Sequence, residues 1–439
     1  MAITPNADRA RSGPTPLPDL IRRFAHLRVA IVHHWFVRQG GGEGFVAHLA
    51  ELFPQADLFA LTARPEGIPI RLRGRKLTTS WLQKVPGSRR YHRLFLPLFP
   101  LALEQFDLSG YDLVISSDSG PAKGVVTGTK TCHICYCHSP MRYLWEMYPE
   151  YRRQAPGGAL GRAVFALSSH YVRQWDLATA SRPDFFATNS LTSARRIRKF
   201  YRRDATVIYG PIDTGSFQAA AQREPFYLVV SRLVGYKRVD LAIEACNRLG
   251  RQLVVIGSGE EAAALRRRAG PTVRMLGNCS GAAVREHYSR CRALLFPGEE
   301  DQGVTPIEAQ ASGAPVIAFG RGGALETVRG WWPGQPMPPD ATGVFFPEQS
   351  ADGLVAAMTA FEEHEAEFSP AVLREQAERF DVSRFYPRMA DFISSCLEQW
   401  HGEGGDAAGD AAPPIAAAAA AGVARASPPT QNPHDAYHS

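Results

Sequence analysis

Short apolar segments alternate with longer amphipathic segments over most of the chain, from about Leu27 to Trp400. This alternation is typical of parallel β-sheets covered by helices, because each parallel crossover needs a long connection. Most apolar segments end in loops rich in glycine, serine, proline or acidic residues, where open α/β sheets hold their ligands. The clearest strands are expected at residues 28–33, 113–116, 133–137, 226–231, 252–256, 274–276, 293–296 and 315–318.

The chain has 439 residues, which is more than one hydrophobic core usually supports, so we expect two domains. A turn-rich break after Ile208 separates two series of strands. The expected parts are a flexible extension over 1–26, one Rossmann-like domain over 27–208, a second over 209–378, a C-terminal helix over 379–400 that returns to the first domain, and a disordered Ala-, Gly- and Pro-rich tail over 401–439.

The net charge of +6 favours an anionic partner, such as nucleotide phosphates, a lipid pyrophosphate or a bilayer surface. No RNA-binding or zinc-finger pattern supports nucleic acid as that partner. The sequence has no run of eighteen apolar residues, and the first 24 residues lack the apolar core of a secretory signal. Seven cysteines do not form a disulfide framework. We therefore expect a cytoplasmic protein.

The strongest motif contains two glutamates eight residues apart, Glu300 and Glu308, after the strand expected at 293–296. We expect Glu300 on the loop at the strand's carboxyl end and Glu308 in the first turn of the next helix. The backbone amides of Gly303 and Val304 would then be free to bind hydroxyls or an anion. Carboxylates suit the hydroxyls of a sugar or ribose. The alternative is that these acids only favour a helix N-terminus.

Two further loops indicate a site for phosphates. Arg232 and Lys237 follow the strand expected at 226–231 and could neutralise a diphosphate leaving group without a metal. Gly41 and Gly42 lie between the first strand and the first helix, where glycine lets the backbone approach a ligand closely. For Arg232 and Lys237, the alternative is a solvated surface loop, and the glycine segment matches neither the dinucleotide pattern nor a Walker loop.

In their order along the chain, these motifs resemble those of family 4 retaining glycosyltransferases of the GT-B fold. The early His-His-Trp and Gly-Gly-Gly-Glu segments, Ser-Arg-Leu-x-x-x-Lys-Arg at 231–238 and Glu-x7-Glu at 300–308 carry the resemblance. Residues 136–145 resemble the bacterial mannosyltransferase branch that builds O-antigen and exopolysaccharide. The resemblance implies two Rossmann-like domains whose parallel sheets face each other across a cleft, the first for the acceptor and the second for the donor.

The resemblance also implies residue roles. Glu300 would bind the donor sugar and Glu308 the ribose, while His138 would contact the sugar near the reacting centre. The catalytic residues would be Glu300, His138, Arg232 and Lys237. The donor-binding residues would be Gly41, Gly42, Arg232, Lys237, Glu300, Gly303, Val304 and Glu308. Attack would occur on the front face, with the donor phosphate accepting the acceptor's proton. No cofactor, metal or nucleophilic side chain is then expected.

The function expected from this resemblance is transfer of mannose from GDP-mannose to a lipid-linked oligosaccharide at the inner face of the plasma membrane. Basic and apolar residues over 71–103 indicate either contact with anionic lipid or a solvated loop followed by a buried helix. Lys123 is a candidate contact to the acceptor phosphate. The alternatives are a UDP-hexose donor and a catalytically silent glycan-binding or scaffold protein.

Two other motifs compete with this interpretation. Gly257-Ser258-Gly259 with Ala262 matches the dinucleotide pattern of an NAD-dependent oxidoreductase. The acidic residue that such a site needs about twenty positions later is absent, so a tight turn is favoured. Three cysteines and a histidine within residues 132–138 suggest a metal, but alternation along a strand would place them on opposite faces.

Overall fold

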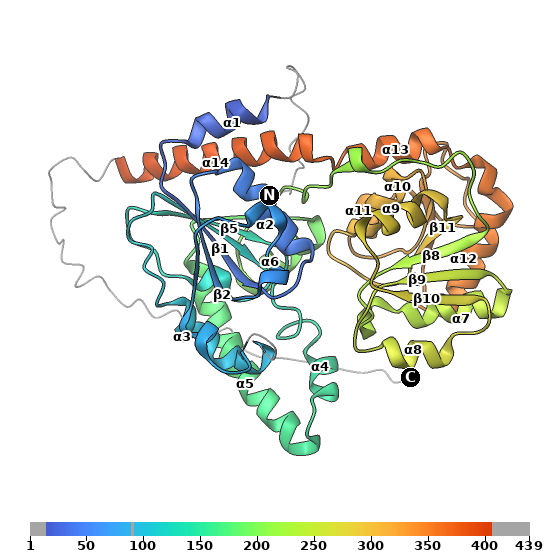
Figure 1. Cartoon of the computed structure of the whole chain (residues 1–439), viewed down its shortest axis with the longest axis horizontal. Helices are drawn as coiled ribbons and strands as arrows, with labels where there is room; N and C mark the ends of the chain where they lie inside the picture. Colours follow the sequence, from blue (N-terminus) through green and yellow to red (C-terminus); the bar gives the residue numbers. More distant parts are fainter. Residues whose placement is uncertain (1–14, 89–91, 406–439) are drawn as a thin grey trace, which may run out of the picture. The chain divides into compact units, whose positions relative to one another are not determined.

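The computed structural model describes residues 15–88 and 92–405 and contains two seven-stranded sheets (Figure 1). The strand order of the first sheet is β3-β2-β1-β4-β5-β6-β7, and every pairing is parallel. Its strands are β1 (Val29–Phe36), β2 (Asp57–Ala63), β3 (Leu77–Thr79), β4 (Leu113–Asp118), β5 (Cys132–Cys137), β6 (Phe185–Thr188) and β7 (Thr206–Val207).

The second sheet has the order β10-β9-β8-β11-β12-β14-β13 and is also parallel throughout. Its strands are β8 (Phe226–Val230), β9 (Gln252–Ile256), β10 (Val273–Gly277), β11 (Ala293–Phe296), β12 (Val316–Phe319), β13 (Gly330–Trp331) and β14 (Gly343–Phe346). In each sheet the chain reverses direction across the sheet, between β1 and β4 and between β8 and β11. Ligands of open α/β sheets bind at the carboxyl ends of such strand pairs.

Helices connect the strands of both sheets. The α-helices that precede or connect the strands of the first sheet are α1 (Leu17–Phe24), α2 (Gly41–Leu52), α3 (Phe99–Leu103), α4 (Tyr148–Gln154), α5 (Gly158–Ala178) and α6 (Leu191–Tyr201). Those of the second sheet and the C-terminal region are α7 (Val239–Leu249), α8 (Ala262–Arg268), α9 (Gly281–Arg290), α10 (Val304–Ala311), α11 (Ala324–Thr327), α12 (Ala351–His364), α13 (Pro370–Glu378) and α14 (Val382–Gly405).

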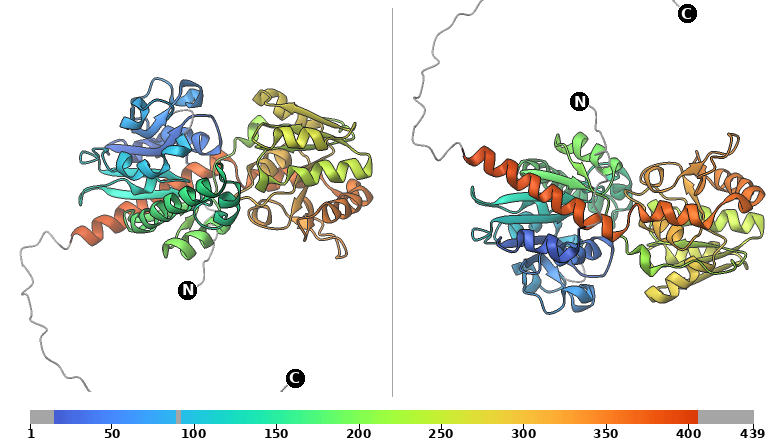
Figure 2. Two further views of the ribbon diagram at one scale, coloured as in Figure 1. Left: turned by 90° about the horizontal axis from the view of Figure 1, so that it is seen from below. Right: turned by 90° about the horizontal axis from the view of Figure 1, so that it is seen from above.

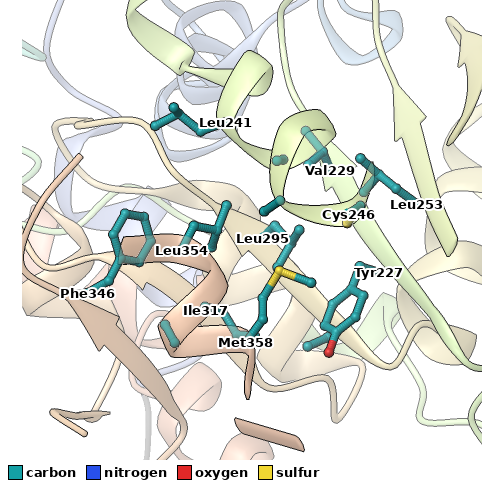
Figure 3. Close-up of a cluster of buried hydrophobic side chains, with 14 of the residues drawn as sticks. Tyr227, Val229, Leu241, Cys246, Leu253, Leu295, Ile317, Phe346, Leu354 and Met358 are labelled. Carbon is teal, nitrogen blue, oxygen red and sulfur yellow. The ribbon is translucent and has the colours of Figure 1, made fainter. Parts of the chain in front are cut away.

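Side chains that alternate along β8 enter two different hydrophobic clusters. Tyr227 and Val229 pack with α7 and α12 residues such as Cys246 and Met358 (Figure 3). Leu228, between them, packs with α9 and α10 residues on the opposite face. A strand buried on both faces is continuously apolar, which is why this segment was recognisable from the sequence. The hydrophobic clusters on both faces of the sheet fix the positions of β8 and β11, and with them the loops that follow these strands.

The first and last described helices, α1 and α14, contact each other, and α14 also contacts α2. The course of α14 can be followed in Figure 2. Its Tyr386 hydroxyl forms a hydrogen bond with His48 Nδ1 at 2.9 Å, and its Asp391 pairs with Arg23 of α1 at 2.8 Å. We expected a flexible extension over 1–26, but residues 17–24 of it form the helix α1. Leu20 and Phe24 lie one turn apart in α1 and are buried, and Phe24 packs on Phe53.

The described residues up to Leu397 form one compact unit, which ends within α14. Both sheets thus belong to one unit, and the domain limits near residues 208 and 378 stay a prediction. The expected disordered tail falls mostly on residues 406–439, outside the described residues. Within the described segments, no helix has the length and apolar character needed to cross a membrane.

Candidate functional site

The loops that follow β8 and β11 meet through an ion pair between Lys237 and Glu300. Lys237 ends the short 3-10 helix η8 (Gly235–Lys237), and its side chain is only 12% exposed. Gly298 permits this approach, because a Cβ atom there would lie 2.9 Å from the Lys237 Cα atom. The Lys237–Glu300 pair brings the two strongest sequence motifs together at the carboxyl ends of adjacent strands.

Arg232 lies on the same loop as Lys237 and is exposed. Its guanidinium donates a hydrogen bond to the hydroxyl of Tyr236 at 3.0 Å. An exposed guanidinium beside a partly buried ammonium can bind an anion at two points. The positions of Arg232 and Lys237 therefore suit a diphosphate.

The glycine turn after β9 supports this loop. A Cβ atom at Gly257 would lie 1.8 Å from the Ser231 carbonyl oxygen, and one at Gly259 would lie 2.1 Å from the Leu233 carbonyl oxygen. Leu233 N also donates to the Ser258 carbonyl at 2.9 Å. The Gly-x-Gly pattern therefore has a packing role beneath Arg232, which accounts for it without a dinucleotide.

Glu308 lies in the second turn of α10, one turn later than expected from the sequence. Its Oε2 atom accepts a hydrogen bond from the Tyr288 hydroxyl at 2.9 Å. Burial raises the pKa of Glu308 to about 7, although the Tyr288 hydrogen bond and Arg285 act in the opposite direction. Gly303 precedes the helix with φ of 77°, a left-handed conformation that favours glycine.

A pair of glycines after β12, which the sequence analysis did not select, fixes the loop that carries Glu300. Gly323 N donates to the Glu300 carbonyl oxygen at 2.8 Å. A Cβ atom at Gly323 would lie 2.3 Å from the Asp301 carbonyl oxygen, and one at Gly322 would lie 2.5 Å from the Glu300 carbonyl oxygen. Only glycine permits this close packing. The sequence signal that could have identified this support is the pair of adjacent glycines shortly after the strand β12.

Arg196 of α6 is a second residue that the sequence analysis missed. It is nearly buried and forms ion pairs with Asp301 and with Glu146, the latter at 2.8 Å, while Glu299 lies at 3.7 Å. Asp301 and Glu299, which flank Glu300, are thus neutralised by a residue distant in sequence. In the part of the chain that the structure describes, no cluster of three or more His, Cys, Asp or Glu side chains suits a metal ion.

Gln302 and Glu326 form further long-range contacts. The Gln302 amide makes two hydrogen bonds to the backbone of Gly210, at 3.1 and 3.2 Å. The Glu326 carboxylate accepts hydrogen bonds from Leu191 N and Thr192 N, at 2.8 and 3.0 Å, in the first turn of α6. A carboxylate at this position satisfies amides that an α-helix leaves unpaired. Arg196 and the Gln302 contacts thus hold residues 299–302 against α6 and the segment after β7, and Glu326 ties α11 to the start of α6.

At the end of the first sheet, His138 follows β5 and is partly buried. Its Nε2 atom lies 3.0 Å from the Ser117 hydroxyl. Burial lowers the pKa of His138 to about 4, although Asp301 acts to raise it, so the ring is neutral near pH 7. Phe45 and Tyr136 pack edge to face against this ring, each with centroids 5.0 Å away.

The glycine loop begins α2 as expected, with Gly40 as its N-cap and Gly41 as its first residue. A Cβ atom at Gly41 would meet no atom within 4 Å, whereas one at Gly42 would lie 3.3 Å from His33 Cε1. The adjacent Glu43 is buried, and this burial raises the pKa of its carboxyl to about 7. Glu43 is a titratable group at the helix start that the sequence analysis did not select.

Lys123 does not have the position expected of an acceptor contact. Its side chain is fully buried and forms an ion pair with the equally buried Asp176 of α5. Asp176 also accepts hydrogen bonds from Trp145 Nε1 at 2.7 Å and from the Tyr201 hydroxyl at 3.0 Å. The Lys123 ammonium is therefore enclosed among core residues and cannot meet an acceptor phosphate.

The segment over 71–103 also differs from the expected lipid-contacting surface. Leu82, Phe99 and Leu103 are buried in the core beneath the first sheet, while Leu101 is 64% exposed. Arg89 and Arg90 lie outside the described residues. All seven cysteines are unpaired thiols, and the three over residues 132–137 are buried.

Comparison with known proteins gives this geometry a context. Residues 214–380 match the model of the family described as Glycosyl transferases group 1. This segment contains Arg232, Lys237, Glu300 and Glu308, and the match supports the predicted superfamily. No curated protein sequence matches the chain.

Solved structures show the same fold at low sequence identity. HepE from Anabaena, in complex with UDP-glucose, is 16% identical over 84% of this chain and 100% of its own, with a TM-score of 0.61. Sucrose-phosphate synthase from Thermosynechococcus elongatus is 18% identical over 85% of this chain and 100% of its own, with a TM-score of 0.62. The catalytic domain of starch synthase IV from Arabidopsis thaliana, bound to ADP and acarbose, is 16% identical over 86% of this chain and 99% of its own, with a TM-score of 0.57. The predicted GT-B fold is confirmed.

The raised pKa of Glu308 predicts a pH-dependent effect of Glu308→Gln. The folded protein favours the protonated acid, so wild type loses stability as pH rises from about 4.5 to about 7. The glutamine variant lacks this loss and should be more stable than wild type by up to about 3 kcal/mol above pH 7, with little difference at pH 4.

Urea unfolding at pH 4 to 8 measures this difference. The matched control is Glu348→Gln at an exposed position, which should change little with pH. A Glu308→Gln variant that is less stable than wild type at pH 8 would show that the folded protein holds this carboxylate ionised.

Proposed function

We propose that this protein is a retaining glycosyltransferase that uses a nucleotide-sugar donor and needs no metal ion. The observation that carries the proposal is the Lys237–Glu300 ion pair beside the exposed Arg232, at the carboxyl ends of β8 and β11. The family match over residues 214–380 supports the same reaction class. The two sheets would correspond to an acceptor domain over 27–208 and a donor domain over 209–378.

In this proposal, the cations act on the leaving group. The bond between the anomeric carbon and the donor phosphate breaks, and its electron pair leaves with the nucleoside diphosphate. Arg232 and Lys237 stabilise the negative charge that develops there. The acceptor oxygen bonds to the same face of the anomeric carbon, and its proton passes to the leaving phosphate oxygen. These steps balance without an enzymic nucleophile.

Glu300 would have two roles. Without a donor, its carboxylate neutralises Lys237. With a donor bound, Lys237 can move its interaction to phosphate, while Glu300 accepts hydrogen bonds from sugar hydroxyls. Glu308, close in sequence but paired with Tyr288, would accept from ribose. The backbone amides of Gly41, Gly42, Gly303 and Val304 would complete the donor contacts at two helix starts.

GDP-mannose is the proposed donor, supported by the resemblance of residues 136–145 to a mannosyltransferase branch. The alternative is a UDP-hexose, since HepE binds UDP-glucose. A catalytically silent glycan-binding protein is the third candidate. It differs from both by binding a glycan without turnover.

The proposed acceptor is a lipid-linked oligosaccharide at the inner face of the plasma membrane, and α5 offers a surface for contact with that membrane. Leu160, Val164, Leu167 and Tyr171 are 75%, 55%, 74% and 53% exposed. Their spacing of four, three and four residues places them on one helix face. Residues 151–175 contain four arginines and no acidic residue. Apolar and basic groups together suit an anionic bilayer.

Glu300→Gln tests the central carboxylate. The amide keeps the side chain's shape but loses the charge that pairs with Lys237 and that accepts from sugar hydroxyls. We expect sugar transfer to fall at least about 100-fold, while nucleoside diphosphate affinity stays within a few-fold. Radiolabelled sugar transfer and calorimetric titration measure the two quantities, with Glu348→Gln as the control. Transfer at the wild-type rate would contradict the role of Glu300.

Cosedimentation with lipid vesicles tests the α5 surface. Wild type should bind vesicles containing phosphatidylglycerol more strongly than vesicles of phosphatidylcholine alone. The double variant Leu160→Ser/Leu167→Ser should lose at least five-fold in binding, because two apolar side chains can no longer insert. Ile70→Ser, which is equally exposed but lies elsewhere, should bind like wild type. Equal binding by the double variant would exclude this helix face as the docking surface.

A further inference from the structure

Ser117 lies between two histidines at the carboxyl end of the first sheet. It is the second-last residue of β4 and pairs in register with His33 of β1. His33 Nδ1 lies 3.0 Å from the Ser117 carbonyl oxygen and 3.2 Å from its hydroxyl oxygen. His138 Nε2 lies 3.0 Å from the same hydroxyl. His33 and Ser117 are fully buried.

The carbonyl group determines which nitrogen of His33 carries the proton. A carbonyl oxygen can only accept, so His33 Nδ1 must donate to it. The same N–H also points to the Ser117 hydroxyl oxygen, which accepts on that side. Burial lowers the pKa of His33 to about 3, with His138 acting in the same direction, so the ring is neutral and has one N–H.

The Ser117 hydroxyl then fixes the tautomer of His138. Its single proton is not needed by His33, and among the described residues its remaining partner is His138 Nε2. A hydroxyl that accepted from both rings would leave its own proton without a partner among the described residues, so we assign Ser117 as the donor to Nε2. That nitrogen is then an acceptor, and the ring proton of His138 is on Nδ1. In water, a neutral histidine favours the opposite form, with the proton on Nε2.

We propose that Ser117 is a positioning residue that holds His138 as the Nδ1–H tautomer, so that His138 meets the donor sugar as a hydrogen-bond donor and not as a base. The sugar contact rests on the proposed function, whereas the tautomer rests only on the hydrogen bonds of the first sheet. Phe45 and Tyr136 support this arrangement by restricting the ring of His138 from its edges.

The role follows from the chemistry of a neutral imidazole. With Nε2 occupied by the Ser117 hydroxyl, Nδ1–H can donate to a sugar oxygen but cannot remove a proton. A donor of this kind can align a hydroxyl oxygen beside the reacting carbon. The reaction proposed above needs no side-chain base, because the leaving phosphate accepts the proton.

Nitrogen NMR of the full chain, labelled with ¹⁵N-histidine, tests the tautomer directly. The chain has 13 histidines, so His138→Gln identifies the His138 signals by their loss. At pH 7.5 we expect a protonated Nδ1 and an unprotonated Nε2 in wild type. Ser117→Ala should shift His138 towards the Nε2–H form, and Ser117→Thr, which keeps the hydroxyl, should restore the wild-type pattern.

Kinetics then test the consequence for the reaction. Ser117→Ala should lower kcat at least ten-fold with donor KM within three-fold, and Ser117→Thr should recover most of kcat. A His138 proton on Nε2 in wild type, or an unchanged tautomer in Ser117→Ala, would overturn the proposal. The wild-type spectrum decides the tautomer even where Ser117→Ala does not fold. Absence of all sugar transfer would contradict the proposed function but leave the tautomer result intact.

Discussion

The ion pair between Lys237 and Glu300 is the interaction on which the rest of the site depends. It joins the loops that follow the adjacent parallel strands β8 and β11. The two side chains can meet only because the backbone of each loop packs closely against neighbouring backbone segments. Glycines at 257, 259, 298, 322 and 323 allow this close packing, since a side chain at any of them would collide with a neighbouring backbone. The site is therefore held by close backbone packing, and its charges are placed by that packing.

Charge is distributed unevenly around this pair. Asp301 and Glu299 pair with Arg196, whereas the exposed Arg232 guanidinium donates a hydrogen bond to the uncharged Tyr236 hydroxyl. Two more carboxyls, Glu43 and Glu308, have pKa values raised to about 7 by burial, so they carry only part of their charge near neutral pH. His33 and His138 are neutral for the same reason. A dianionic ligand would therefore meet the exposed Arg232 guanidinium first, and it would compete with Glu300 for Lys237.

The sequence predicted the fold because its strands are buried on both faces. Segments such as Phe226–Val230 and Ala293–Phe296 are short, apolar and followed by turn residues, and they were placed within one residue. The strand Asp57–Ala63 was missed because a short, continuously apolar run has no periodicity that separates a buried strand from a buried helix segment. Edge strands such as Thr206–Val207 are too short to give any periodicity.

The site was predictable where a motif is contiguous and not where contacts are long-range. Lys237 and Glu300 follow recognisable strands, but Arg196 contacts Asp301 from 105 positions away, and nothing local to either residue indicates the other. Lys123 shows the converse error. Its place on a loop after a strand made it a candidate acceptor contact, while Asp176, the residue that pairs with its charge in the core, lies 53 positions later.

The most direct test of the central claim is the thermal stability of the purified chain with GDP, UDP, ADP and NADH, each with and without EDTA. A ligand at 100 times its dissociation constant stabilises the folded state by about 2.7 kcal/mol, which a melting curve resolves. We expect GDP to raise the melting temperature equally with and without EDTA, and Arg232→Ala to remove most of that shift. Stabilisation by NADH and by no nucleoside diphosphate would contradict the account and would indicate a dinucleotide site at the turn after β9.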